Sequence, residues 1–291
     1  MIAPERILSR VKELPTLSSA AVRLSALARD ERSSAADFEK AIRPDPALTA
    51  NLLRLVNSAF FGLRCRAESV RQAVTLIGLR RTSEVAAAAA LGPVIPRLLP
   101  GYEIDASAFW LHCVAVGVLS ERLSGELGVK RPDLTFTAGL LHDLGKLAIG
   151  IFVADASGEI LARTRQGGMS FVTAERVVLG VDHAEVGAHG AQAWTLPAAI
   201  GDVSRWHHEP GSAPEGSDRL LVDLVHVADA LAHALGMGAD VGEMARAVDP
   251  ATEARLGIRA RRLEHVAGES LEEIRELERQ FAPAAAGGGT R

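Results

Sequence analysis

The sequence has few of the features on which several large protein classes depend. Its two cysteines, Cys65 and Cys113, supply no disulfide framework and no CxxC metal pair, and reduced thiols fit a reducing cytoplasm. Aromatic residues make up only 4% of the chain, while alanine and leucine are abundant. The formal net charge of −4 argues against bulk electrostatic attraction to nucleic acid or to an anionic membrane.

Long apolar runs are missing as well. The longest, residues 85–96, is interrupted by Gly92 and Pro93 and falls short of the roughly 20 residues that a membrane-spanning helix requires. The first residues contain an early glutamate and no apolar stretch, so they predict no secretory signal. We therefore expect a soluble cytoplasmic protein that binds neither membrane nor nucleic acid. The basic stretch 255–262 is interpreted as a solvated helix face.

Helix signals recur along the whole chain, whereas the alternation typical of strands does not. Ser34 with Asp37 forms a capping-box pattern, and Asp45 precedes a proline at the first position of a helix. Gly78 marks the end of a helix or a break in it, and Asp105 begins a long helix that ends near residue 128. The sequence predicts an all-α protein, a two-lobed helical bundle.

Three segments are expected along the chain. The stretch 93–105, with three prolines and a glycine, separates an N-terminal helical lobe (1–104) from a second helical lobe (105–236). Residues 237–291 form a C-terminal helical extension with a disordered tail from residue 284. In the second lobe we expect helices over 132–149, 173–178, 182–194, 196–208 and 220–235, a turn at 163–168, and a terminal helix over 270–280.

Chemistry-bearing residues are concentrated in the second lobe, each group on a different predicted helix. Asp229 lies on the inward face of an apolar helix, where a carboxylate is costly unless a cation or hydrogen bonds compensate it. A divalent ion shared with the inward-facing His112 meets this need, and mixed imidazole and carboxylate ligands suit Fe, Mn, Zn or Ni. The ordered series is His112, then His142 with Asp143 in mid-helix, His183 at a helix start, His207 with His208 at a helix end, and Asp229.

Each member of the series also has a plainer explanation. An inward histidine is commonly a hydrogen-bonded core residue. The adjacent His207 and His208 could cap a helix end, and Asp229 could hold a serine, threonine or arginine. The ordered series on successive helices favours the metal. The remaining histidines are not expected to be ligands, although one of them could support a ligand from behind; they are His189, His226 (one turn before Asp229), His233 and His265.

The series resembles the HD superfamily of metal-dependent phosphohydrolases, named for an adjacent His-Asp pair. The resemblance spans roughly residues 112 to 229, and Leu-Leu-His-Asp-Leu-Gly-Lys (140–146) is similar to the HDxGK signature of its phosphodiesterase branch. The chain from about 14 to 235 resembles more specifically the HDOD family, bacterial signalling proteins with an HD-related output domain. The matching stretches are LPTL (14–17), DPAL (45–48), LRLVNSAFFG (53–62), SVRQAVTLIG (69–78) and WTLP (194–197).

This resemblance implies an HD-type helical core that holds one or two divalent ions (Fe, Mn, Ni or Zn). Asp143 would bridge the two ions. Lys146 lies on the same helix face as His142; it could reach a substrate phosphate, or it could be a surface lysine at the helix end. The implied ligands are His112, His142 and Asp229 for one ion and His183, His207 and His208 for the other.

Three departures from better-known relatives weaken their substrates as candidates. The Gly-Tyr-Pro of cyclic-di-GMP phosphodiesterases is replaced by Pro-Gly-Ser-Ala (210–213), a glutamate of three-metal relatives by Ala108, and the acidic pair of alarmone hydrolases by Leu-Gly-Lys (144–146). We therefore predict a regulatory signalling module that acts through a protein partner or a nucleotide ligand. The complete ligand set favours the alternative, an active phosphohydrolase or phosphodiesterase acting on a nucleotide or cyclic nucleotide.

Overall fold

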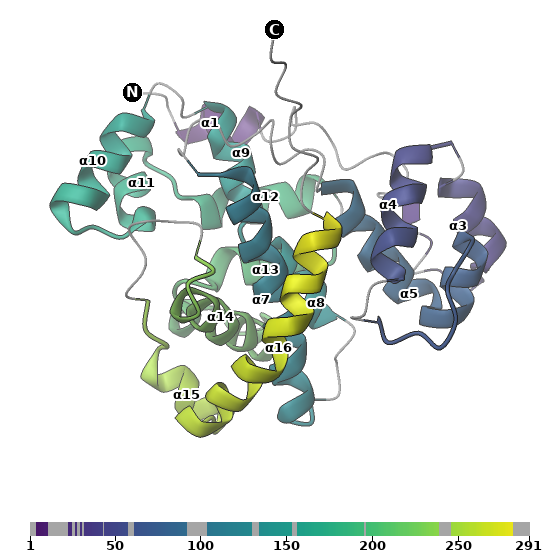
Figure 1. Ribbon diagram of the computed structural model, residues 1–291. Coiled ribbons are helices and arrows are strands. Elements are labelled where there is room, and N and C mark those ends of the chain that lie inside the picture. Colours follow the sequence, from purple (N-terminus) through teal and green to yellow (C-terminus); the bar gives the residue numbers. More distant parts are fainter. Residues whose placement is uncertain are drawn as a thin grey trace, which may run out of the picture.

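The computed structural model describes residues 4–10, 23–24, 27, 30, 32–42, 44–57, 61–91, 104–129, 134–152, 156–194, 196–238 and 246–281. These residues form helices and no strands, which confirms the all-α prediction (Figure 1). None of the described helices combines the length and the hydropathy needed to cross a bilayer. The helices are α1 (Pro4–Arg10), α3 (Ala35–Ile42), α4 (Pro46–Val56), α5 (Val70–Leu91), α7 (Ala106–Glu126), α8 (Thr135–Leu141), α9 (Leu144–Phe152), α10 (Ser157–Gly167), α11 (Phe171–Leu179), α12 (His183–Ala193), α13 (Ala198–Trp206), α14 (Arg219–Ala234), α15 (Pro250–Leu256) and α16 (Ala260–Phe281).

Helices α3, α4 and α5 form one lobe, at the right in Figure 1. Its helix starts follow the predicted caps: the Ser34 hydroxyl donates to Asp37 (2.6 Å), and the carboxylate of Asp45 accepts the amide of Leu48 (2.9 Å). The predicted break in α5 is confirmed at Gly78, whose φ of 81° only glycine adopts easily. Short-range sequence signals therefore account for these two helix starts and for the break in α5.

The second lobe is built around α7, which packs against α8, α14 and α16. Beside it, α12 packs against both α9 and α13 (Figure 1). Asp105 caps α7 by accepting the amides of Ser107 and Ala108, as predicted. The terminal helix α16 contacts α4 as well as α7, so it connects the two lobes.

Three predicted elements differ from the structure. The helix expected over 132–149 is two helices, because the chain tightens at His142 and Asp143, where the amide of Lys146 bonds to the carbonyl of Asp143, three residues back (2.9 Å). The turn expected at 163–168 is mostly the last part of α10, which is capped by Gly168 in a left-handed conformation. Helix α16 begins ten residues before its predicted start, at Ala260.

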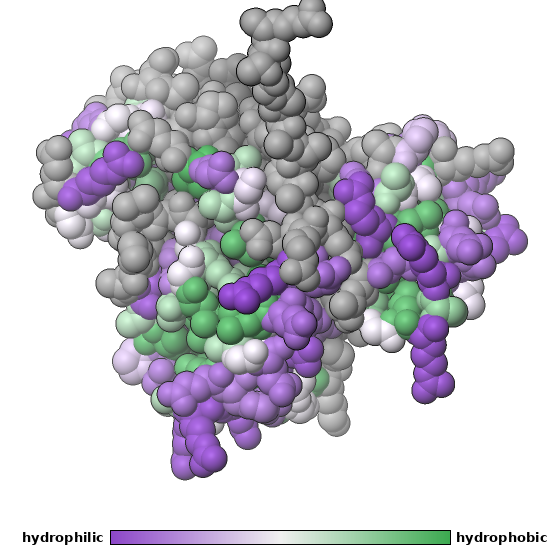
Figure 2. Space-filling model, viewed as in Figure 1, coloured by the Kyte–Doolittle hydropathy of each residue, from purple (hydrophilic) through white to green (hydrophobic). Residues whose placement is uncertain are grey.

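Some predicted features fall outside the described residues. These are the LPTL stretch at 14–17, nearly all of the separating segment 93–105 and the tail from residue 284. The basic stretch is described, and Arg259, Arg261 and Arg262 are exposed, as expected of a solvated face. In Figure 2, hydrophilic side chains cover this region, where α15 and the start of α16 lie.

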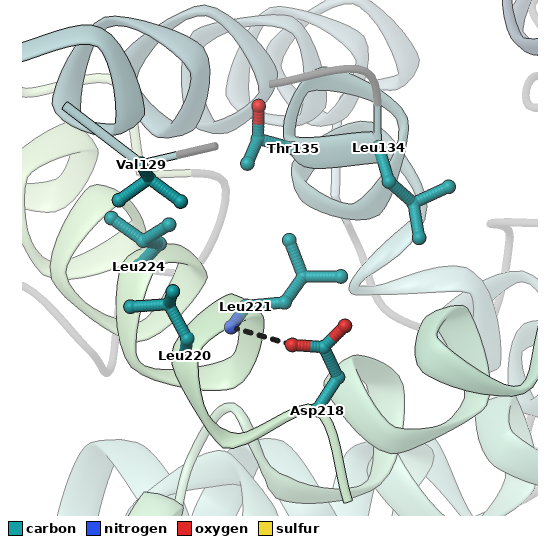
Figure 3. A pocket seen from close by; sticks show the side chains of 7 residues that line it. All are labelled: Val129, Leu134, Thr135, Asp218, Leu220, Leu221 and Leu224. Carbon is teal, nitrogen blue, oxygen red and sulfur yellow. Dashed lines mark hydrogen bonds between the residues drawn. The ribbon is translucent and has the colours of Figure 1, made fainter. Parts of the chain in front are cut away.

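A small apolar cavity lies where α7 and α14 meet the start of α8 (Figure 3). Asp218 caps α14 at this cavity by accepting the amide of Leu221 (3.3 Å). The cavity volume of about 20 Å³ is close to that of a single water molecule. It is therefore too small to bind a ligand larger than water.

Candidate metal centre

Three buried histidines have their ring orientation fixed by backbone carbonyls. His112, His142 and His207 each place Nδ1 against a carbonyl oxygen; the acceptors are Met237 (3.1 Å), Gly139 (2.6 Å) and Ser204 (2.9 Å), respectively. A carbonyl can only accept, so Nδ1 carries the proton in each ring. When such a ring is neutral, its Nε2 atom is therefore a lone-pair donor that points into the lobe, the form in which imidazole binds metals. Burial opposes protonation of His112, but Asp229 raises the pKa of this ring, so a metal ion at its Nε2 would compete with a proton.

Two of these Nε2 atoms meet the carboxylate of Asp229. His112 Nε2 lies 3.2 Å from His142 Nε2 and 3.3 Å from Asp229 Oδ1. His142 Nε2 lies 3.8 Å from the same oxygen. Three acceptor atoms cannot converge in this way unless a proton or a cation joins them.

Asp143 lies at the junction of α8 and α9, and its two oxygens face different histidines. Oδ1 is 3.3 Å from His183 Nε2 and 3.6 Å from His207 Nε2. Oδ2 is 3.5 Å from His142 Nε2 and 3.7 Å from His112 Nε2. This carboxylate therefore contacts both halves of the cluster.

The predicted site residues come together in two groups. In each group the potential ligand atoms lie within 4.8 Å of one another. One group is His112, His142 and Asp229, and the other is Asp143, His183, His207 and His208. All are buried except His208, which is partly exposed, so the edge of the centre nearest solvent is at His208.

Two glycines explain how α9 and α12 approach closely enough to form the second group. A Cβ atom on Gly145 would lie 1.8 Å from the carbonyl oxygen of His183 and 2.7 Å from the amide nitrogen of Gly187. A Cβ atom on Gly187 would lie 2.1 Å from Ser204 Oγ on α13. The glycine between Asp143 and Lys146 therefore permits a backbone contact that brings His183 against Asp143.

Buried cations neutralise the carboxylates. The Lys146 side chain is 1% exposed, and its ammonium lies 2.8 Å from Asp143 Oδ2. Burial would raise the pKa of Asp143, but the Lys146 ammonium beside it holds that pKa well below its usual value. The surface-lysine alternative was therefore wrong. Asp229 does hold an arginine, one of the plainer explanations above, because Arg246 Nη1 lies 2.5 Å from Asp229 Oδ2.

The histidines differ in charge. Burial lowers the pKa of His142 to about 3, so this ring is neutral at physiological pH. Burial also opposes protonation of His183, yet Glu175, whose carboxylate lies 2.7 Å from its Nδ1, raises the pKa of His183 to about 10. A proton on His183 Nε2 also explains the 2.6 Å contact with His208 Nε2. A metal ion at this nitrogen would replace that proton.

The donor set fits a divalent ion. Among the described residues, buried atoms without a hydrogen-bond partner occur in both groups, for example Asp229 Oδ1 in one and Asp143 Oδ1 and His207 Nε2 in the other. Buried polar atoms are nearly always paired, so these atoms indicate a missing partner in each group. Imidazole nitrogens and carboxylate oxygens together are ligands for Zn, Fe, Mn or Ni.

A comparison with known protein families identifies the family to which this sequence belongs. The profile of the HDOD domain matches residues 14–210. The chain belongs to the HDOD family. An uncharacterized protein of Treponema pallidum (strain Nichols) is 28% identical over 219 residues, which are 72% of this HDOD chain and 40% of that protein. The chain therefore spans less than half the length of that relative.

Solved structures share the HDOD fold along nearly their full length. An HDOD domain protein of unknown function from Geobacter sulfurreducens is 22% identical, with a TM-score of 0.74 over 95% of this chain and 97% of that one. A candidate phosphohydrolase from Shewanella amazonensis is 25% identical, with a TM-score of 0.75 over 94% and 97% of the two chains. These likenesses establish the helical architecture.

Three residues of the HDOD centre escaped the sequence analysis. Glu175 bonds to both the ring and the backbone amide of His183 (2.7 and 2.8 Å), but no local pattern connects α11 with α12. Arg246 comes from an irregular segment beyond the matched family region. His233 was set aside, yet its Nε2 lies 3.5 Å from Asp229 Oδ1, and its spacing of four residues from Asp229 was a usable signal.

The other histidines behave in two ways. His226 supports the centre from behind: its Nδ1 donates to the carbonyl of His207 (2.7 Å), and its Nε2 accepts the amide of Asp249 (2.9 Å). His189 and His265 are exposed.

Proposed function

We propose that this HDOD protein is a regulatory signal-transduction module whose HD-type centre binds one or two divalent ions. The observation that carries the proposal is the position of Asp143, whose two oxygens each face a separate group of histidines. The predicted ligand sets coincide with these groups, which supports the assignment of Asp143 as the shared ligand. The signalling role rests on membership of the HDOD family and on an N-terminal lobe in which we find no catalytic motif.

Each side chain has a defined task in this centre. When bound, divalent ions supply positive charge to phosphoryl oxygens and lower the pKa of water. His112, His142 and His207 offer fixed Nε2 lone pairs, because their Nδ1 protons are held by the backbone. Glu175 orients His183.

Elemental analysis of the purified protein tests the centre directly. We expect near-stoichiometric Fe, Mn, Ni or Zn in the wild type and its loss in Asp143→Ala. Asp37→Ala, which removes a surface helix cap in the other lobe, is the matched control and should retain the metal. Absence of metal from the wild type, even after reconstitution without oxygen, would sink the proposal.

Hydrolysis of a phosphate ester is a second candidate function. It is favoured by the arrangement around Asp143, because two-metal hydrolases share a ligand between their ions, and by the buried ammonium of Lys146 beside it. Bis(p-nitrophenyl) phosphate and cyclic nucleotides are suitable probes, with Asp143→Asn as the inactive variant. If the metal-loaded wild type hydrolyses none of them, the function is regulatory, through a protein partner or a bound nucleotide.

A further inference from the structure

Arg246 touches one potential ligand from each group. Its Nη1 lies 2.5 Å from Asp229 Oδ2, and its Nη2 lies 3.5 Å from His208 Nε2. The side chain is 13% exposed, whereas Asp229 is fully buried. The guanidinium thus enters the centre from the partly exposed edge at His208.

The contacts of Arg246 use electron pairs that a metal ion would need. A guanidinium has only donors, so its close contact with Asp229 Oδ2 points an N–H at a carboxylate lone pair that a metal ion would use. Its contact with His208 Nε2 is longer, and the lone pair of that nitrogen already faces His183 Nε2 at 2.6 Å. With Arg246 in place, Asp229 also offers an ion only Oδ1, because Oδ2 is taken.

The formal charges of the centre also indicate that Arg246 and divalent ions compete for it. Three carboxylates (Asp143, Asp229 and Glu175) face two protein cations (Lys146 and Arg246), a formal charge of −1 once a metal ion has replaced the proton on His183 and the imidazoles are neutral. Two divalent ions would bring this charge to +3, and departure of Arg246 would reduce it to +2. Burial of excess charge of one sign is unfavourable, so ion binding and the arginine oppose each other.

Lys146 and Arg246 differ in how deeply they are buried and in which segment carries them. Lys146 is on α9 itself, three residues after Asp143, and is buried. Arg246 reaches in from another segment through a long side chain with an exposed part. Three residues further on, Asp249 is anchored by its amide to His226 (2.9 Å). The segment that follows Arg246 is therefore held independently of the guanidinium, and displacement of the side chain would leave this anchor intact.

From this arrangement we propose that Arg246 is an internal substitute cation. It occupies the Asp229 side of the centre in the metal-free protein and is displaced when a divalent transition-metal ion binds there. The inference rests on the proposed metal centre and adds to it a residue that sets the ion concentration at which the centre fills. Removal of the guanidinium should strengthen metal binding, the opposite of the loss caused by removal of a ligand.

Calorimetric titration of the metal-stripped full chain with Mn²⁺ tests the proposal. We expect Arg246→Gln and Arg246→Met to bind Mn²⁺ at least about tenfold more tightly than the wild type, because no ion pair has to be broken. Arg255→Gln is the matched control: it removes an arginine paired with Asp223 on α14 (2.7 Å) and should leave the affinity unchanged. Equal or weaker binding in both Arg246 variants would show that the arginine orients Asp229 as a ligand, and would overturn the proposal.

A second measurement needs no variant. Phenylglyoxal labels accessible arginines, and peptide mass spectrometry reports the rate at Arg246. Labelling should be faster with saturating Mn²⁺ than without it, with Arg255 as the internal reference; unchanged or slower labelling contradicts displacement. If the wild type and all variants bind no Mn²⁺, the metal centre itself fails, whereas equally tight binding by all of them removes only the role of Arg246.

Discussion

The close contact between α9 and α12 gives the sharpest prediction, for Gly145→Ala. The added Cβ would lie 1.8 Å from the carbonyl oxygen of His183 and 2.7 Å from the amide of Gly187. Both atoms belong to the backbone, so no side-chain rotation relieves the overlap. Non-bonded heavy atoms rest at about 3.5 Å, and the two helices must therefore separate by more than about 1 Å.

Such a separation has two measurable consequences. Overpacking of a core costs about 1–3 kcal/mol and sometimes more, and a clash with backbone belongs at the upper end, so the free energy of unfolding should fall by about 3 kcal/mol. Because His183 moves away from Asp143, metal affinity should also fall by more than about tenfold, since ligand sites require placement within about 0.5 Å.

Urea unfolding and Mn²⁺ titration measure the two effects. The matched control is Gly268→Ala in α16, where an added Cβ meets nothing within 4 Å. The same substitution should there increase stability by about 0.5–1 kcal/mol, because alanine restricts the unfolded chain and favours the helix. If Gly145→Ala is as stable as the wild type and binds Mn²⁺ equally well, the explanation of the motif glycine is wrong.

Three further predictions concern the charged groups. Glu175→Gln should lower the pKa of His183 in an NMR titration and weaken Mn²⁺ binding about 10–100-fold. An unchanged Mn²⁺ affinity would show that Glu175 does not orient His183 as a ligand. Lys146→Met breaks the buried ion pair with Asp143, so the metal-free variant should lose about 3–5 kcal/mol in urea unfolding, and added Mn²⁺ should restore part of it. The pKa of His142 is near 3 in the folded chain and 6.5 in the unfolded one, so between these values only the unfolded state binds the proton. Stability of the metal-free protein should therefore decrease as pH falls from about 6.5 towards 3, with a contribution of about 1.4 kcal/mol per pH unit that His142→Gln removes.

The sequence alone predicted those structural features that depend only on residues close to one another in the chain. The caps at Asp45 and Asp105 and the break at Gly78 each follow from one or two side chains and the local backbone. The interruption at His142 and Asp143 was not predicted, because the run around it is largely apolar. Its turn-forming residues, Gly139, Asp143 and Gly145, were the available signal. In the tertiary structure, α9 meets the backbone of α12 at Gly145.

The same distinction divides the residues of the centre. The ordered histidines and aspartates are visible as polar residues on apolar helices, and the structure brings all of them together. Glu175 and Arg246 were missed because their partners belong to other segments and their own surroundings in the sequence are ordinary. A sequence predicts ligands from the cost of burying them, but it gives no sign of the counter-charges that a fold supplies from elsewhere.

The ends of helices determine the chemistry of this centre. His183 is the first residue of α12, and His207 is the residue that follows α13. The last carbonyls of a helix have no partner within it, and the His207 ring satisfies one of them by donating Nδ1–H to Ser204. That bond caps the helix and at the same time leaves Nε2 free of a proton, facing Asp143. One hydrogen bond thus stabilises the end of α13 and also keeps His207 Nε2 available as a metal ligand. A substitution of His207 would therefore disturb both the centre and the helix that carries it.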